Sequence, residues 1–314
     1  MSALPGIPNP LSVIRTASGR VVQLKVHRGN WSGAYPENSL PAIEECYREC
    51  VARAEIDLHM LRDADFLVLH DAQVDVSTTG SGAVADLTRH DAQALRLRFG
   101  GVSAERPPLF SEVVALIAAQ PYPTLLELDL PASTPLPWER LEWLARAVGP
   151  VRDRVIFNGA DWNLRRLLRV DPTLPMSFDP ATYLDWLPAG DPDGSELPRG
   201  AYGYLDAHPL ARHRLTSVGD YLADRLGGIA RLVPGAREAH LRLLAFERML
   251  DDGVQDAAGD LFHRQGLKLD VWTLNAGTPG WRERLACALA AGVDVITTDT
   301  PQALAAAGQE ALGS

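Results

Sequence analysis

The chain has few of the features that membrane-bound or nucleic-acid-binding proteins need. It has no run of 18 apolar residues, and its first 20 residues lack the charged segment and long apolar run of a secretory signal. The formal net charge is −10, which excludes a broad basic surface, so a bound anion must meet a local group of cations. These absences predict a cytoplasmic protein whose partner is a small molecule, with no nucleic acid and no membrane insertion. They leave the oligomeric state open.

Cysteine is also scarce, with three residues in 314. Cys46 and Cys50 are four residues apart in a helical pattern, and Cys287 lies in a second such pattern. Thiols on helix faces are usually packing residues, so no disulfide, metal or catalytic role is expected for them.

Short runs rich in Val, Ile and Leu alternate with helical patterns along most of the chain. The candidate strands are residues 21–27, 54–60, 124–130, 154–158, 174–178, 240–246, 267–275 and 293–298. Eight strands separated by helices are typical of parallel βαβ units, so the sequence predicts an α/β fold, a single-domain (β/α)8 TIM barrel.

The predicted barrel spans residues 21–305, after an N-terminal extension (1–20) and before a C-terminal tail (306–314). Residues 179–235 are dense in Pro, Gly, Asp and aromatics. We interpret them as an irregular insertion between strands five and six that could act as a lid.

Polar residues gather where the predicted strands end, and the active sites of such barrels lie at the carboxyl ends of their strands. His27 closes the first strand, and His70 with Asp71 ends a later apolar run. Glu55 and Asp57 are two residues apart in strand two, so strand alternation aims both carboxylates at one face.

Glu127 and Asp129 repeat this spacing in strand three. Carboxylates directed together repel one another unless a cation or a proton offsets their charge. If the offsetting charge is a metal ion, hard oxygen ligands suit Mg²⁺ or Ca²⁺ better than zinc, with Mn²⁺ as a further candidate.

The ordered motifs resemble the glycerophosphodiester phosphodiesterase family, of the phospholipase-C-like TIM-barrel superfamily. They are His27-Arg28-Gly29, Pro36-Glu37-Asn38-Ser39, Glu55-Ile56-Asp57, His70-Asp71, the turn TTGSG, Glu127, VWTLN (271–275) and GVDVITTDTPQAL (292–304). The resemblance covers roughly residues 21–305 and implies hydrolysis of a glycerophosphodiester of lipid metabolism to glycerol 3-phosphate and an alcohol.

By the same resemblance, the metal is expected on Glu55, Asp57 and Glu127. His27 and His70 are expected to act as acid and base, in an order that the sequence leaves open. The resemblance also implies that Arg28 binds phosphate and that Trp272 faces the pocket. Glu37 and Asn38 are expected to support the first loop.

Two positions depart from the family pattern. Val76 stands where the family commonly has an arginine, and Asp129 where it commonly has a lysine. Lys25 shares the inward face of His27, and we hypothesise that it pairs with Asp129 across the barrel. Lys25 then either contacts the substrate or only neutralises a buried acid.

Because of these departures, three functions remain open. The first is a phosphodiester hydrolase, and the second is a lyase of the same superfamily that forms a cyclic phosphate. The third is a noncatalytic or altered-substrate relative.

Overall fold

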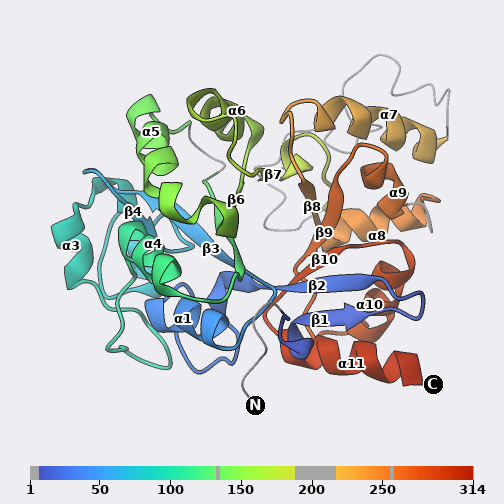
Figure 1. The fold of residues 1–314 in the computed structure, drawn as a ribbon, viewed down its shortest axis with the longest axis horizontal. Coiled ribbons are helices and arrows are strands. Elements are labelled where there is room, and N and C mark those ends of the chain that lie inside the picture. The colour runs from blue at the N-terminus through green and yellow to red at the C-terminus, as the bar shows by residue number, and fades with distance from the viewer. Residues whose placement is uncertain (1–6, 132–134, 188–216, 255–257, 314) are drawn as a thin grey trace.

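The computed structural model describes residues 7–131, 135–187, 217–254 and 258–313. Within these residues eight parallel strands form a barrel with helices packed outside it (Figure 1). The barrel strands are β2 (Val21–Val26), β3 (Arg53–Met60), β5 (Leu125–Asp129), β6 (Val155–Asn158), β7 (Ser177–Phe178), β8 (Glu238–Arg242), β9 (Lys268–Trp272) and β10 (Val295–Thr298).

The strands are hydrogen-bonded in the order β6-β5-β3-β2-β10-β9-β8-β7. A parallel bridge between Phe157 and Met176 joins the two ends of this order, and the Phe157 N–H donates to the Pro175 carbonyl at 3.0 Å. The eight strands therefore nearly close, and the predicted TIM barrel is confirmed. Two antiparallel strands extend it: β1 (Val13–Arg15) pairs with β2, and β4 (Phe66–Val68) pairs with β3.

The helices follow the strands in the expected alternation. The α-helices are α1 (Leu40–Arg48), α2 (Val74–Ser77), α3 (Arg89–Ala94), α4 (Phe110–Ala119), α5 (Trp138–Ala147), α6 (Asp161–Val170), α7 (Val218–Ala230), α8 (Leu243–Asp251), α9 (Ala258–His263), α10 (Trp281–Ala290) and α11 (Pro301–Gly313). The 3-10 turns are η1 (Pro10–Ser12), η2 (His27–Gly29), η3 (Val84–Asp86), η4 (Gly149–Arg154) and η5 (Pro180–Thr182). None of the helices in the described ranges has both the length and the apolar character that a membrane span requires.

Strand alternation separates an apolar layer from a polar interior. On β2, Val22, Leu24 and Val26 are fully buried in the core between the barrel and its helices. The residues between them, including Lys25, therefore face the barrel interior. On β3 and β5 the apolar residues likewise alternate with Arg53, Glu55, Asp57, Glu127 and Asp129.

Several expected boundaries differ from the structure. The run at 240–246 is not one strand, because β8 ends at Arg242 and α8 begins at Leu243. Cys50 lies beyond α1 and has a positive φ of 55°. The expected end of the barrel at residue 305 falls inside α11.

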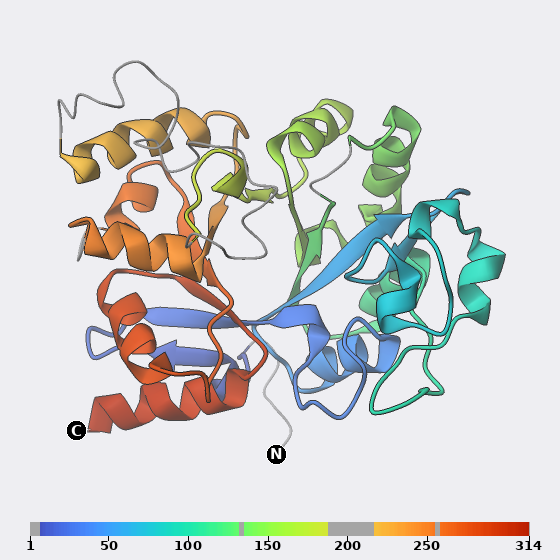
Figure 2. The same cartoon turned by 180° about the vertical axis from the view of Figure 1, so that it is seen from behind.

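In both views α11 lies along β1 and β2 (Figures 1 and 2).

The insertion at 179–235 contains η5 and α7 in its described parts. About half of this segment, which was expected to act as a lid, lies outside the described residues, at 188–216.

Candidate active site

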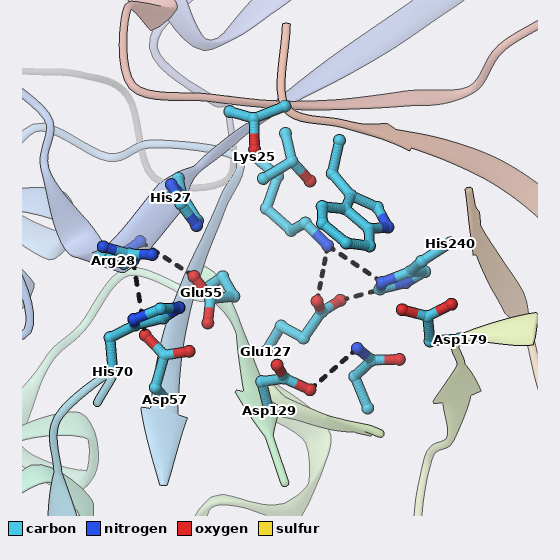
Figure 3. A pocket seen from close by; sticks show the side chains of 14 residues that line it. Lys25, His27, Arg28, Glu55, Asp57, His70, Glu127, Asp129, Asp179 and His240 are labelled. Carbon is cyan, nitrogen blue, oxygen red and sulfur yellow. Dashed lines mark hydrogen bonds and ion pairs between the residues drawn. The ribbon is translucent and has the colours of Figure 1, made fainter. Parts of the chain in front are cut away.

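A cavity of about 270 Å³ opens at the carboxyl ends of the barrel strands (Figure 3). Its walls are formed by Lys25, His27, Arg28, Glu55, Asp57, His70, Glu127, Asp129, Asn158, Asp179, His240, Trp272, Thr273 and Thr297. The fold therefore brings nine of the eleven site residues expected from the sequence to one cavity. The other two, Glu37 and Asn38, line a smaller neighbouring cavity of about 160 Å³, to which His70 also belongs.

His27 is held by a carboxylate that the sequence analysis did not single out. Its Nδ1 lies 2.7 Å from Oδ1 of Asp299, and the Asn275 amide donates to Oδ2 of Asp299 at 2.6 Å. Burial tends to raise the pKa of Asp299, but the hydrogen bond and charge of His27 hold it below its usual value. Asp299 directly follows the eighth strand, so the strand-end argument that found His27 could have found it too.

His70 is the more exposed of the two expected catalytic histidines. Its side chain is 48% exposed, and its Nδ1 lies 3.1 Å from Oδ1 of Asp71. The ring of His59 donates from Nε2 to the His70 carbonyl at 2.9 Å, which fixes the backbone there. Both imidazoles line the cavity, and each has a carboxylate beside one ring nitrogen.

Arg28 connects the first loop to the acidic residues of β3. Its backbone adopts a left-handed conformation (φ 52°), and its N–H donates to Oε2 of Glu55 at 2.9 Å. The guanidinium pairs with Glu37 at 3.0 Å, and its Nε lies 3.7 Å from Oδ2 of Asp57. A guanidinium held at the cavity by these carboxylates is suitably placed to meet an anion.

Asn38 positions Asp57 from the same loop. It is 1% exposed, its Nδ2 donates to Oδ2 of Asp57 at 2.7 Å, and its Oδ1 accepts from the Asp57 N–H at 3.2 Å. These contacts and the Arg28–Glu37 pair link the first loop to the cavity wall, and the supporting roles of Glu37 and Asn38 stay a prediction.

Three carboxylates meet at the side of the cavity formed by β3 and β5. Glu55, Asp57 and Asp129 each offer an oxygen within 4.8 Å of the other two. Burial and the charges of Asp57 and Asp129 raise the pKa of Glu55 well above its usual value. Burial and the charges of Asp57 and Glu127 raise the pKa of Asp129 to about 8.

This acidic cluster (Glu55, Asp57 and Asp129) fits a divalent cation. Its donors are all carboxylate oxygens, which Mg²⁺ and Ca²⁺ prefer. The crowding that raises the two pKa values is the repulsion that a bound cation would relieve. Asn158, 6% exposed in the cavity wall, donates to Asp129 at 3.0 Å, and its own Oδ1 has no hydrogen-bond partner among the described residues.

Glu127 faces a different set of groups. Its Oε1 lies 2.5 Å from the ammonium of Lys25, which also pairs with Asp270 at 2.6 Å. The hypothesised Lys25–Asp129 pair is therefore wrong. Lys25 is 1% exposed and held by two carboxylates, so it neutralises buried acids, and these contacts give no support to a phosphate-binding role.

Lys25 and Glu127 belong to a larger buried network that the sequence analysis missed. Arg53 pairs with Glu238 at 2.7 Å, and His240 lies 3.4 Å from Oε2 of Glu127. Burial and the charge of Lys25 lower the pKa of His240, but Glu127, Asp270 and Glu238 together outweigh them and the pKa is raised. The buried network (Lys25, Arg53, His240, Glu127, Glu238 and Asp270) thus contains three cationic and three anionic groups when His240 is protonated.

Trp272, at the end of β9, lines the cavity as expected. The guanidinium of Arg242 lies 4.7 Å from the centre of its ring. This contact holds the indole at the barrel mouth, opposite the acidic cluster on β3 and β5.

The fold and the site define an α/β barrel with two histidines, an arginine and an acidic cluster at its mouth. A model of the Glycerophosphoryl diester phosphodiesterase family matches residues 27–178, the stretch from His27 to the end of β7. This match covers just under half of the chain and supports the family that the motifs predicted.

Curated relatives resemble parts of the chain. It is 32% identical over 105 residues to a glycerophosphodiester phosphodiesterase of Caldanaerobacter subterraneus subsp. tengcongensis, a match that covers 32% of this chain and 43% of that one. It is 36% identical over 95 residues to glycerophosphodiester phosphodiesterase 1 of Bos taurus, covering 28% of each chain. The matches thus span less than half the length of these relatives.

Solved structures match nearly the whole fold. A putative glycerophosphoryl diester phosphodiesterase from Silicibacter pomeroyi superposes with a TM-score of 0.62 and 20% identity, over 93% of this chain and 92% of that one. A phosphodiesterase from Oleispira antarctica, solved with its product sn-glycerol-3-phosphate, gives a TM-score of 0.59 and 17% identity over 91% and 96%. At these identities the likeness establishes the barrel and nothing finer.

Proposed function

We propose that this protein is a divalent-metal-dependent phosphodiester hydrolase that cleaves a glycerophosphodiester to glycerol 3-phosphate and an alcohol. The observation that carries the proposal is one cavity that brings together the imidazoles of His27 and His70, the guanidinium of Arg28 and the acidic cluster. The family match and the Oleispira product complex support the substrate class.

Charge stabilisation is the first task of such a site. Cleavage of a phosphodiester builds negative charge on the nonbridging oxygens, and Arg28 offers N–H donors for two of them. A divalent ion on the acidic cluster, when bound, would neutralise and polarise the same phosphate. Glu37 and Asp57 hold the guanidinium of Arg28 in place for this contact.

Proton transfer is the second task. A water oxygen forms a bond to phosphorus while the bond from phosphorus to the alcohol oxygen breaks. One imidazole takes a proton from the water, and the other gives a proton to the departing alkoxide. Because Nδ1 of His27 is hydrogen-bonded to Asp299, Nε2 is the nitrogen through which His27 exchanges its proton.

Hydrolysis with added metal tests the proposal directly. Purified protein is assayed on glycerophosphocholine, glycerophosphoethanolamine and bis(p-nitrophenyl) phosphate with Mg²⁺, Ca²⁺ or Mn²⁺, beside a chelator. We expect metal-dependent turnover that falls about 10²- to 10⁴-fold in His27→Ala and in His70→Ala. The exposed His90 lies outside the cavity, so His90→Ala is the matched control and should keep full activity.

The choice of substrate also assigns the two histidines. Nitrophenolate leaves without a proton, so the variant that lacks the general acid should retain most of its activity on the nitrophenyl ester and lose it on the choline ester. Phosphorus NMR separates glycerol 3-phosphate from the cyclic phosphate that a lyase would form. No turnover on any of the three substrates with any of the metals would refute the proposed function.

A further inference from the structure

We propose that the third carboxylate on the divalent cation is Asp129 and not Glu127, because Lys25 holds Glu127 in a buried ion pair. The inference rests on the metal dependence of the proposed function and assigns its ligands. It replaces the set expected from the family pattern, in which Glu127 joins Glu55 and Asp57.

The oxygens of Glu127 already face cations. Oε1 lies 2.5 Å from the Lys25 ammonium. Oε2 lies 3.4 Å from Nε2 of His240 and 3.7 Å from Nη2 of Arg53. To bind a metal ion, Glu127 would have to turn away from three groups that neutralise it, and a buried ammonium would lose one of its two carboxylates. Leaving a buried charge without its partner is costly, which holds Glu127 where it is.

Asp129 has the opposite surroundings. Its hydrogen bond among the described residues comes from Asn158, a neutral amide, at 3.0 Å. It is paired in register with Asp57 across β3 and β5 and lies in the same group of carboxylate oxygens as Glu55. In Figure 3 Asp129 and Asp57 lie on the same side of the cavity, whereas Glu127 points toward Lys25 and His240.

The balance of charge leads to the same assignment. In the buried network the carboxylates Glu127, Glu238 and Asp270 are matched by Lys25 and Arg53 and, when it is protonated, by His240. The acidic cluster has three carboxylates, and the guanidinium of Arg28, 3.7 Å from Asp57, is the cation paired with it among the described residues. A divalent cation therefore finds uncompensated negative charge at the acidic cluster and almost none at the buried network.

A second potential group of metal ligands, Glu127, Glu238 and His240, fails for the same reason. Lys25 and Arg53 already pair with its carboxylates. A metal ion bound there would lie beside the charges of Lys25 and Arg53, and His240 would have to be neutral to ligate it.

Metal affinity measured without turnover tests the assignment. Mn²⁺ binding to the metal-free protein is titrated by electron paramagnetic resonance in the wild type and in isosteric variants. Asp129→Asn should weaken Mn²⁺ binding at least about tenfold, because even outer partners of metal ligands contribute about 10- to 100-fold. Glu127→Gln should change the dissociation constant less than about threefold.

Asp179→Asn is the matched control, because it removes another carboxylate from the wall of the same cavity but outside the acidic cluster. Asp179→Asn should leave the Mn²⁺ dissociation constant within about threefold of the wild-type value. Glu55→Gln is the control for the metal site itself and should weaken Mn²⁺ binding at least about tenfold.

The results separate the inference from the proposed function on which it rests. If Glu55→Gln weakens binding and Asp129→Asn does not, the inference is overturned and the metal site stands. A loss of at least tenfold in Glu127→Gln overturns the inference as well, whether or not Asp129→Asn shares it. If Glu127→Gln does not fold, the Mn²⁺ affinities of Asp129→Asn and Asp179→Asn still decide whether Asp129 is a metal ligand. If Glu55→Gln and Asp129→Asn both bind as tightly as the wild type, the metal site of the proposed function fails.

Discussion

Replacing Lys25 by methionine removes the cation at the centre of the buried network while keeping a similar side-chain volume. Lys25 is 1% exposed, and its ammonium lies 2.5 Å from Glu127 and 2.6 Å from Asp270. The variant leaves both carboxylates in the barrel interior without their closest cation. Removal of one partner from a buried ion pair costs about 3–5 kcal/mol.

The neighbouring charges place Lys25→Met at the lower end of that range. Arg53 and His240 still lie within 4.0 Å of Glu127, and Thr297 still donates to Asp270. We therefore expect the free energy of unfolding to fall by about 3 kcal/mol. Unfolding entropies near 2.1 cal/mol/K per residue amount to about 0.66 kcal/mol/K for this chain, so Tm should fall by about 5 °C.

Calorimetry of the metal-free protein measures this change. Lys268→Met is the control, because it makes the same chemical change at an exposed position and should move Tm by less than about 1 °C. Lys25→Met combined with Asp270→Asn should recover part of the loss by removing one unpaired carboxylate. If Lys25→Met unfolds within about 1 °C of the wild type, or at a higher temperature, the network does not stabilise the barrel and the reasoning is wrong.

Three further variants or conditions test the site. Asp299→Asn should lower kcat by about 10²- to 10⁴-fold with little change in KM, because His27 loses the carboxylate that orients it; an unchanged kcat would remove Asp299 from the catalytic machinery. The folded-state pKa of Asp299 is lowered, so its contribution to stability is present above its unfolded pKa and is lost as pH falls through the folded value. Acid titration of Tm should therefore be shallower in Asp299→Asn than in the wild type, and parallel curves would contradict this. Asn38→Ala should weaken Mn²⁺ binding about 10- to 100-fold, since Asp57 loses its buried partner; equal affinities would show that Asp57 needs no positioning. Mg²⁺ or Ca²⁺ at about 100 times its dissociation constant should stabilise the protein by about 2.7 kcal/mol, an effect that a chelator reverses. A Tm that does not respond to either ion would contradict this last prediction.

Strand periodicity was enough to place the site residues on one face of the barrel. Glu55 and Asp57, and again Glu127 and Asp129, are two residues apart, so the alternation of side chains fixed their common direction before any contact was known. Apolar neighbours such as Ile56 confirmed it by packing outward.

Alternation could not say which inward-facing groups would meet. Lys25 was expected opposite Asp129, but strand tilt and side-chain length bring its ammonium to Glu127 and Asp270. Asp270 lies inside the apolar run 267–275 and gave no sign of its role. Such contacts join strands that are far apart in the sequence, so they form only when the barrel closes and cannot be predicted from one short segment.

A predicted strand boundary was wrong where the sequence suits both a strand and a helix. The run at 240–246 is apolar enough for a strand, yet the helix α8 begins at Leu243, where the spacing of Leu243, Phe246 and Met249 buries one helical face. Short apolar runs of this kind leave strand and helix undecided until their flanks are placed.

The chain contains only two lysines, and their side chains differ in how far solvent and reagents can reach them. The amine of Lys25 is enclosed and paired, whereas Lys268 is exposed at the start of β9. Trp272, which lines the cavity, ends the same strand, about 13 Å further along it. Of the two lysine side chains, amine-directed coupling should therefore attach a dye or a surface linker at Lys268, on the face of the barrel remote from the cavity, and spare Lys25 in the cavity wall.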